Sequence, residues 1–227
     1  ASLAQGELEL ARQLAAEMGI RHEVIQTDEF SQQDYTRNAP DRCYHCKTEL
    51  YSQLEKLAPR LGVEVLFNGA NLDDLGDYRP GMTAASEHDV KSPLVECGFN
   101  KQDVRDLAAY WELPVWDKPA SPCLSSRVAY GLEVTPERLA RIDAAEQFLR
   151  GHGFSPLRVR EHPGDVARIE VPLEQVEQLC HPPLLRQVKE YLGQLGYQDV
   201  SVDLAGFRSG SLNQLVTLDA GPAEKES

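Results

Sequence analysis

The chain has 227 residues, of which 41% are hydrophobic, and its formal net charge is −13. This composition allows one large domain or two modest ones with a packed core, and the acidic field repels nucleic acid, so we expect no nucleic-acid partner. No apolar run could span a bilayer, we see no secretory signal, and an odd number of cysteines, five, favours a reducing compartment such as the cytoplasm.

The N-terminal half, residues 1–125, alternates helical and extended patterns. In chain order we expect a helix to about Met18, an extended segment over 22–27, a helix over 47–61, a short strand over 63–67 and a helix over 101–111. Strands separated by helices indicate an α/β fold with a doubly wound parallel sheet. Such sheets bind ligands in the loops beyond the carboxyl ends of their strands.

The prolines and glycines between residues 113 and 136 indicate a loop that separates two domains, with the boundary placed at 125/126. Beyond it we expect a helix over 136–150, a hairpin of 157–160 and 166–171 turning at Pro163-Gly164-Asp165, helices near 173–179 and 183–195, and a strand over 199–204. This pattern predicts a small α+β domain over 126–216. The polar tail over 217–227 is expected to be disordered.

The sharpest local motif is Cys43-Tyr-His-Cys46, because a C-x-x-C pair brings two thiolates within reach of one metal centre. A third cysteine, Cys123, lies in a loop rich in proline and serine. Three cysteines can hold a [4Fe–4S] cluster with one iron open to a non-protein ligand, and the alternative is three unrelated thiols. Cys97 and Cys180 are expected to be packing residues.

A second motif places Asp73, Asp74 and Asp77 directly after the strand predicted over 63–67. Carboxylates at the carboxyl end of a buried strand suit Mg²⁺ or the hydroxyls of a nucleotide. The alternative is a solvated acidic loop.

The predicted hairpin places charged residues on one of its faces. Alternation sets Arg158, Arg160, Arg168 and Glu170 opposite its apolar residues. Such a cluster grips phosphates or carboxylates, and the alternative is a solvated face with cross-strand pairs. Either way we expect exposure, so that the loss of Arg158 barely alters folding. Glu146 falls on the apolar stripe of its helix and is expected to pair with an arginine.

Together these segments resemble one known family, the LarE-type ATP-dependent sulfur transferases of the PP-loop superfamily, over about residues 5–215. The resemblance is carried by segments that occur in the same order: Phe67-Asn-Gly-Ala-Asn-Leu-Asp-Asp, Asp77-Tyr-Arg-Pro-Gly81, Ser92-Pro-Leu94, Lys101-Gln-Asp-Val-Arg105, Trp116-Asp-Lys-Pro-Ala-Ser-Pro-Cys-Leu-Ser-Ser-Arg127, Arg158-Val-Arg160 and Gly206-Phe-Arg-Ser-Gly210.

The resemblance implies a PP-loop ATP-pyrophosphatase α/β domain followed by a small α+β domain. It also implies an activity: carboxylates of pyridinium-3,5-biscarboxylic acid mononucleotide are adenylated with ATP and Mg²⁺, and sulfur then replaces the adenylate on the way to the nickel-pincer cofactor. The implied partners are this small anionic nucleotide, ATP, a sulfide donor and further copies of the chain in a homo-oligomer, a hexamer in the family.

The resemblance also assigns roles to individual residues. It places Cys123, Glu146 and Glu170 in the catalytic site. Three arginines match substrate-binding positions of the family: Arg158, Arg160 and Arg208.

Two branches of the family differ in their source of sulfur. One sacrifices its own cysteine, and the other delivers a sulfide bound to a [4Fe–4S] cluster. This chain has Pro122 where the sacrificial cysteine would align and Cys123 one place later, and it has the Cys43/Cys46 pair that the sacrificial branch lacks. Both departures favour a cluster held by Cys43, Cys46 and Cys123.

One family motif, the Ser-Gly-Gly-x-Asp-Ser loop that cradles pyrophosphate, does not occur in this sequence. We expect it to precede Ala1 in a longer protein, and the chain as given should not adenylate a substrate. Two other functions remain open: a tRNA thiolase of the same superfamily, which the acidic charge disfavours, and a non-catalytic metal-binding protein.

Overall fold

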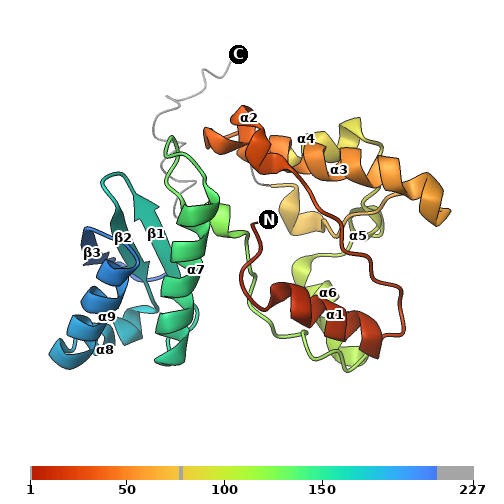
Figure 1. Cartoon of the computed structure of the whole chain (residues 1–227). Coiled ribbons are helices and arrows are strands. Elements are labelled where there is room, and N and C mark those ends of the chain that lie inside the picture. Colours follow the sequence, from red (N-terminus) through yellow and green to blue (C-terminus); the bar gives the residue numbers. More distant parts are fainter. Residues whose placement is uncertain (1, 77–78, 209–227) are drawn as a thin grey trace, which may run out of the picture. The chain divides into compact units, whose positions relative to one another are not determined.

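The computed structural model describes residues 2–76 and 79–208; the tail predicted over 217–227 lies outside these ranges. The chain forms two compact units (Figure 1). Unit 1 comprises residues 3–121, and unit 2 comprises Ser2 and the residues from Pro122 onward. No helix in the part of the chain that the structure describes is long and apolar enough to cross a membrane.

Unit 1 consists of helices joined by loops. Its α-helices are α1 (Glu7–Glu17), α2 (Gln33–Thr36), α3 (Arg42–Leu61), α4 (Pro80–Glu87), α5 (Pro93–Glu96) and α6 (Lys101–Tyr110). Helices α3 and α4 pack against each other around a small core that contains Tyr51, Ala84, Ala85 and Val90. The three helices predicted for this half are confirmed. Helix α3 begins before the predicted position, so Cys43 and Cys46 lie in its first two turns.

The two strands predicted for this half are wrong. Residues 22–27 form no regular element, and residues 63–67 contribute one isolated parallel bridge, between Phe67 and Lys91. A strand needs hydrogen-bonded neighbours as well as apolar residues, and here Val24 is 50%, Val65 48% and Phe67 66% exposed. The residues that the structure describes therefore form no doubly wound sheet. The observed class is a helix-rich α/β protein whose described strands make one three-stranded sheet.

Unit 2 has the predicted α+β pattern. Its elements are α7 (Pro136–Gly151), β1 (Arg158–His162), β2 (Val166–Glu170), α8 (Val176–Leu179), α9 (Pro182–Gln194) and β3 (Asp199–Val202). Strands β1 and β2 form the predicted antiparallel hairpin, whose turn uses the positive φ angles of Gly164 (79°) and Asp165 (55°). Strand β3 pairs in parallel with β2, giving the order β1-β2-β3; α8 and α9 supply the crossover that parallel pairing requires.

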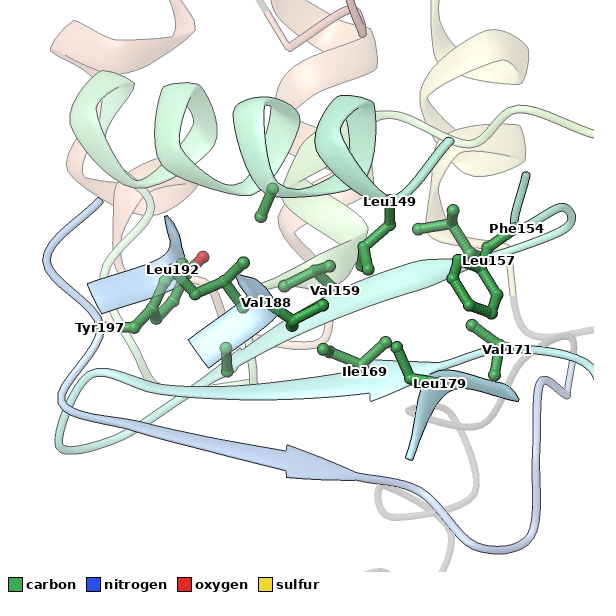
Figure 2. Close-up of a cluster of buried hydrophobic side chains, with 12 residues drawn as sticks. Leu149, Phe154, Leu157, Val159, Ile169, Val171, Leu179, Val188, Leu192 and Tyr197 are labelled. Carbon is green, nitrogen blue, oxygen red and sulfur yellow. The ribbon is translucent and has the colours of Figure 1, made fainter. Parts of the chain in front are cut away.

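One face of this sheet packs under α7 and α9 and forms the core of unit 2 (Figure 2). Leu149 of α7, Val159 of β1, Ile169 of β2, and Val188 and Leu192 of α9 all belong to it and are fully buried. Because side chains alternate along a strand, this packing turns the arginines of the hairpin to the opposite face of the sheet.

Candidate functional site

The second face of the sheet carries Arg158 and Arg160 of β1 and Arg168 and Glu170 of β2; we call these four residues the arginine face. The strand register places Arg158 opposite Glu170 and Arg160 opposite Arg168, which confirms the predicted gathering. The expected exposure is wrong: Arg158 is only 9% and Arg160 only 6% exposed, and Glu170 is fully buried. The alternation fixes the direction of a side chain, but other segments of unit 2 decide whether water reaches it.

Most of these charges are paired. The Nε atom of Arg160 donates to Oε2 of Glu170 at 3.0 Å, and Arg168 lies 3.4 Å from the other oxygen of the same carboxylate. Arg168 and Arg208 each approach Asp203 at 3.7 Å. Arg208, which the sequence predicted to bind substrate, therefore lies near the border of the arginine face and is half exposed.

Arg158 is covered by the segment that follows β3. Its guanidinium carbon lies 5.2 Å from the centre of the Phe207 ring, a cation–π distance, and its Nη1 donates to the carbonyl of Leu157 at 2.7 Å. Phe207 is held in place because its N–H donates to the carbonyl of Val171 at 2.7 Å. The preceding Gly206 has a φ of +73°, and a β-carbon there would lie 3.1–3.2 Å from the backbone of Leu173 and Val171.

The surroundings of Arg158 contain more positive than negative charge. Its pKa is lowered to about 10, first because burial penalises the charged form, then because Arg127, Arg160 and Arg150 repel it, while Glu146 partly opposes these effects. The pKa of His162, on the same strand, is likewise lowered by burial and then by the charge of Arg168. An anion bound at this face would therefore relieve an existing repulsion.

The loop that carries Cys123 lies in the same unit. It continues into the 3₁₀ turn η3 (Leu124–Arg127), and Arg127 is fully buried. The Nε of Arg127 donates to Oε1 of Glu146 at 3.0 Å and its Nη2 donates to Oε2 at 3.2 Å. Arg150 adds a bond to the same carboxylate at 2.8 Å. The predicted pairing of Glu146 with an arginine is thus confirmed.

Unit 2 also has a hollow of about 350 Å³ away from these residues, lined by Arg138, Arg141 and Asp165 among others. Its arginines are already neutralised: both pair with the buried Glu161, and Arg141 also pairs with Asp165. This hollow therefore offers less unbalanced positive charge to an anion than the arginine face does.

The C-x-x-C pair lies in unit 1, in the first two turns of α3. Cys43 is exposed and Cys46 is half-buried, and neither forms a disulfide. Spaced three residues apart on a helix, they share a side of α3. Cys123, an exposed free thiol, belongs to unit 2. No group of three or more His, Cys, Asp or Glu side chains within residues 2–76 and 79–208 is placed to hold a metal ion, and the convergence of the three cysteines stays a prediction.

The acidic motif provides helix caps. Asp74 accepts from the backbone N–H of Asn71 at 3.0 Å and lies 2.9 Å from a nitrogen of Arg79. Asp73 accepts from the backbone N–H of Lys101, at the start of α6, at 2.9 Å. Asp77 lies outside the described residues. A metal ion or nucleotide bound by Asp73 or Asp74 would compete with these contacts.

Replacing Asp73 by alanine should lower the stability of unit 1 by about 1 kcal/mol, because a carboxylate at a helix N-terminus satisfies an orphan N–H and interacts with the helix dipole. Urea unfolding followed by the fluorescence of Trp111 and Trp116 measures this loss. The matched control is Asp106→Ala, which replaces an aspartate within α6, away from the N-terminus that Asp73 caps. A loss in the Asp73 variant no larger than in the control would contradict the cap.

The prediction that Cys97 and Cys180 are packing residues is wrong, because both are exposed. Each is the C-cap residue of a short helix, α5 or α8. No role was predicted for Arg127 or Phe207. Both lay inside the quoted family motifs, beside Cys123 and Arg208, and that position was the available signal.

The chain is 44% identical to an uncharacterized protein of Synechocystis over 216 residues, 95% of this chain and 80% of that protein. It is 38% identical to the pyridinium-3,5-bisthiocarboxylic acid mononucleotide synthase of Lactiplantibacillus plantarum over 211 residues, 93% of this chain and 75% of the synthase. It is also 30% identical over 175 residues to an uncharacterized protein of Methanocaldococcus jannaschii. No family model matches. The identity to the synthase extends over most of both chains, and this chain therefore belongs to the family of LarE-type sulfur transferases.

Proposed function

We propose that this protein converts the carboxylates of pyridinium-3,5-biscarboxylic acid mononucleotide to thiocarboxylates for the biosynthesis of the nickel-pincer nucleotide. The relative from Lactiplantibacillus plantarum carries the name of that product's synthase. The structural observation that carries the proposal is the buried arginine face, with its surplus of positive charge around Arg158. A mononucleotide supplies the phosphate that such a face would bind.

Substrate binding is assigned chiefly to Arg158. Arg160 donates to Glu170 and to the carbonyl of Ser126, and the charge of Arg158 is disfavoured by burial and by the repulsion of Arg127, Arg160 and Arg150. A phosphate at Arg158 would offset this repulsion, and Arg160 would support it from within its network. Arg208, half exposed beside Asp203, is proposed to reach the substrate from the border of the face.

The chemical step we propose begins with ATP. A substrate carboxylate attacks the α-phosphate, pyrophosphate leaves, and an acyl adenylate forms. Sulfide then attacks the carboxyl carbon, a C–S bond replaces the C–O bond, and AMP departs as the leaving group. Asp73, Asp74 and Asp77 are proposed to contact the nucleotide or its Mg²⁺, although the first two act as helix caps in the described structure.

The proposed source of sulfur is external to the polypeptide. Cys43, Cys46 and Cys123 form no disulfide and are exposed or half-buried, and three cysteines are a donor set that suits an iron–sulfur cluster. When bound, a [4Fe–4S] cluster on three thiolates would supply one iron free to hold a sulfide. Pro122, where the sacrificial branch has its cysteine, has no sulfur to give.

The test follows product and protein together. The gene product as the cell makes it, with reconstituted cluster, receives the mononucleotide, ATP, Mg²⁺ and sulfide, and we expect more than one thiocarboxylate per polypeptide. Intact-mass spectrometry should show Cys123 unchanged. A sacrificed cysteine would become dehydroalanine, about 34 Da lighter. Dehydroalanine at position 123 in proportion to product would refute the external source, and the absence of any thiocarboxylate would refute the proposed function.

A further inference from the structure

We propose that Arg127 and Glu146 form a positioning pair that fixes the backbone of Cys123 and connects it to the arginine face. Their relevance to catalysis rests on the proposed function, in which Cys123 takes part in sulfur transfer. The inference changes the role of Glu146, which the family resemblance places among the catalytic residues. Glu146 is fully buried, and its carboxylate accepts hydrogen bonds from Arg127, Arg150 and the N–H of Val159.

The first part of the device is the hold of Arg127 on the loop. Its Nη1 donates to the carbonyl of Pro122 at 2.6 Å, to the carbonyl of Cys123 at 3.0 Å and to Oγ of Ser126 at 3.0 Å. The carbonyl of Cys123 also accepts from Oγ and N–H of Ser126, at 2.7 and 3.0 Å. Exposed thiols on loops are usually mobile. The backbone that carries the Cys123 thiol, however, is fixed by hydrogen bonds from the buried guanidinium of Arg127.

The second part is the anchor. Both oxygens of Glu146 are occupied: Oε1 accepts from Arg127 Nε and from the N–H of Val159 at 3.1 Å, and Oε2 accepts from Nη2 of Arg127 and of Arg150. The carboxylate thereby ties α7 to β1 and to the Cys123 loop. The rigid fork of arginine permits this bidentate geometry together with the carbonyl bonds, which a lysine could not reproduce.

The third part is a direct link between the loop and the arginine face. Nη1 of Arg160 donates to the carbonyl of Ser126 at 2.8 Å, while its Nε binds Glu170 at 3.0 Å. An anion that orders Arg160 would therefore also order the turn η3, which immediately follows Cys123. Binding at the arginine face and the placement of Cys123 are coupled through a single side chain.

A purely stabilising role would not require this set of contacts. A buried ion pair is often no better for stability than an apolar pair of similar volume. Nη1 of Arg127 instead donates hydrogen bonds to the carbonyls of two loop residues, Pro122 and Cys123. The distinction is measurable with a substitution that keeps both buried charges: loss of the positioning contacts then affects the loop locally, whereas loss of a purely stabilising contact affects the whole of unit 2.

Amide hydrogen exchange of Arg127→Lys separates the two roles. The N–H groups of Leu124, Ser126 and Val128 are hydrogen-bonded within unit 2. We expect a peptide covering 122–130 to exchange about tenfold faster in the variant, with β2 unchanged. Arg150→Lys is the matched control and should leave the loop at wild-type rates, since Arg150 donates to Glu146 and forms no hydrogen bond to the loop among the described residues.

Hydrogen exchange with bound sulfate and in a second variant provides two further tests of the positioning role. Sulfate, as an anion probe, should slow exchange in the loop of the wild type and slow it less in the Arg127→Lys protein. If that variant does not fold, Glu146→Asp, which keeps the charge and shortens the side chain, serves in its place. Unchanged loop exchange in either variant, or equal acceleration across unit 2, would overturn the positioning role. These readouts need no turnover, so failure of the proposed sulfur chemistry would not alter them.

Discussion

Glu146→Ala should destabilise unit 2 by about 3–5 kcal/mol, because it leaves Arg127 as a buried cation without its carboxylate partner. Arg127 is only 1% exposed at its side chain, so water cannot replace the lost contact. Urea unfolding monitored by circular dichroism measures the change in the free energy of unfolding. Glu190→Ala, an exposed glutamate of α9, is the matched control and should change stability by less than about 0.5 kcal/mol.

A double variant shows where this loss comes from. Replacing Glu146 by leucine and Arg127 by methionine removes both charges at once, and much of the stability should return, because an apolar pair of similar volume carries no desolvation cost. If the double variant is as unstable as Glu146→Ala, the cavity and not the stranded charge dominates. That result would contradict the electrostatic argument for the buried pair.

Arg158→Gln should weaken the binding of sulfate or of the mononucleotide about 10- to 100-fold, as expected for the loss of a charge-assisted hydrogen bond. Calorimetry at fixed ionic strength measures the affinity. The control is Arg186→Gln, an exposed arginine of α9, which should leave the affinity nearly unchanged. Equal weakening by both variants would indicate that net charge, and not a site at the arginine face, governs binding.

The same substitution should not destabilise the ligand-free protein, and should stabilise it slightly. A base whose pKa falls on folding binds its proton less tightly in the folded than in the unfolded state. The pKa of Arg158 falls to about 10 through burial and repulsion, so its charge opposes folding at every pH below that value, and the opposition fades as the pH rises through it. A marked loss of stability at neutral pH would show that the contacts of Arg158 outweigh the repulsion.

The sequence was most informative where local pattern determines structure. The hairpin turn at Gly164 and Asp165, the alternation along β1 and β2, and the start of α7 at Pro136 follow from short-range rules, and the structure has all of them. The strand predicted over 63–67 failed because an apolar run says nothing of the neighbour it would pair with. Helix propensity needs no partner, which is why the helices were the safer predictions.

The candidate site shows the same division. The sequence placed Arg158, Arg160 and Glu170 on one face, but their burial depends on segments far along the chain, such as Phe207 and the turn after Cys123. The Arg127–Glu146 pair spans helix α7 and a loop, so no spacing rule joins its members. Glu146 was visible as a misplaced charge on an apolar stripe, whereas the identity of its partner required the fold.

The cover over Arg158 at the arginine face depends on Gly206, a residue without a side chain. A methyl group there would meet the backbone of Leu173 and the carbonyl of Val171 at 3.1–3.2 Å, and backbone atoms cannot rotate away as a flexible side chain does. The backbone at residue 206 would have to move away from Leu173 and Val171. Phe207 would move with it, and water would then reach Arg158. The local dielectric around that guanidinium would rise, its repulsion from the neighbouring arginines would be screened, and its attraction for an anion would weaken. The absence of a side chain at residue 206 thus influences the strength of the electrostatic attraction between Arg158 and a bound phosphate.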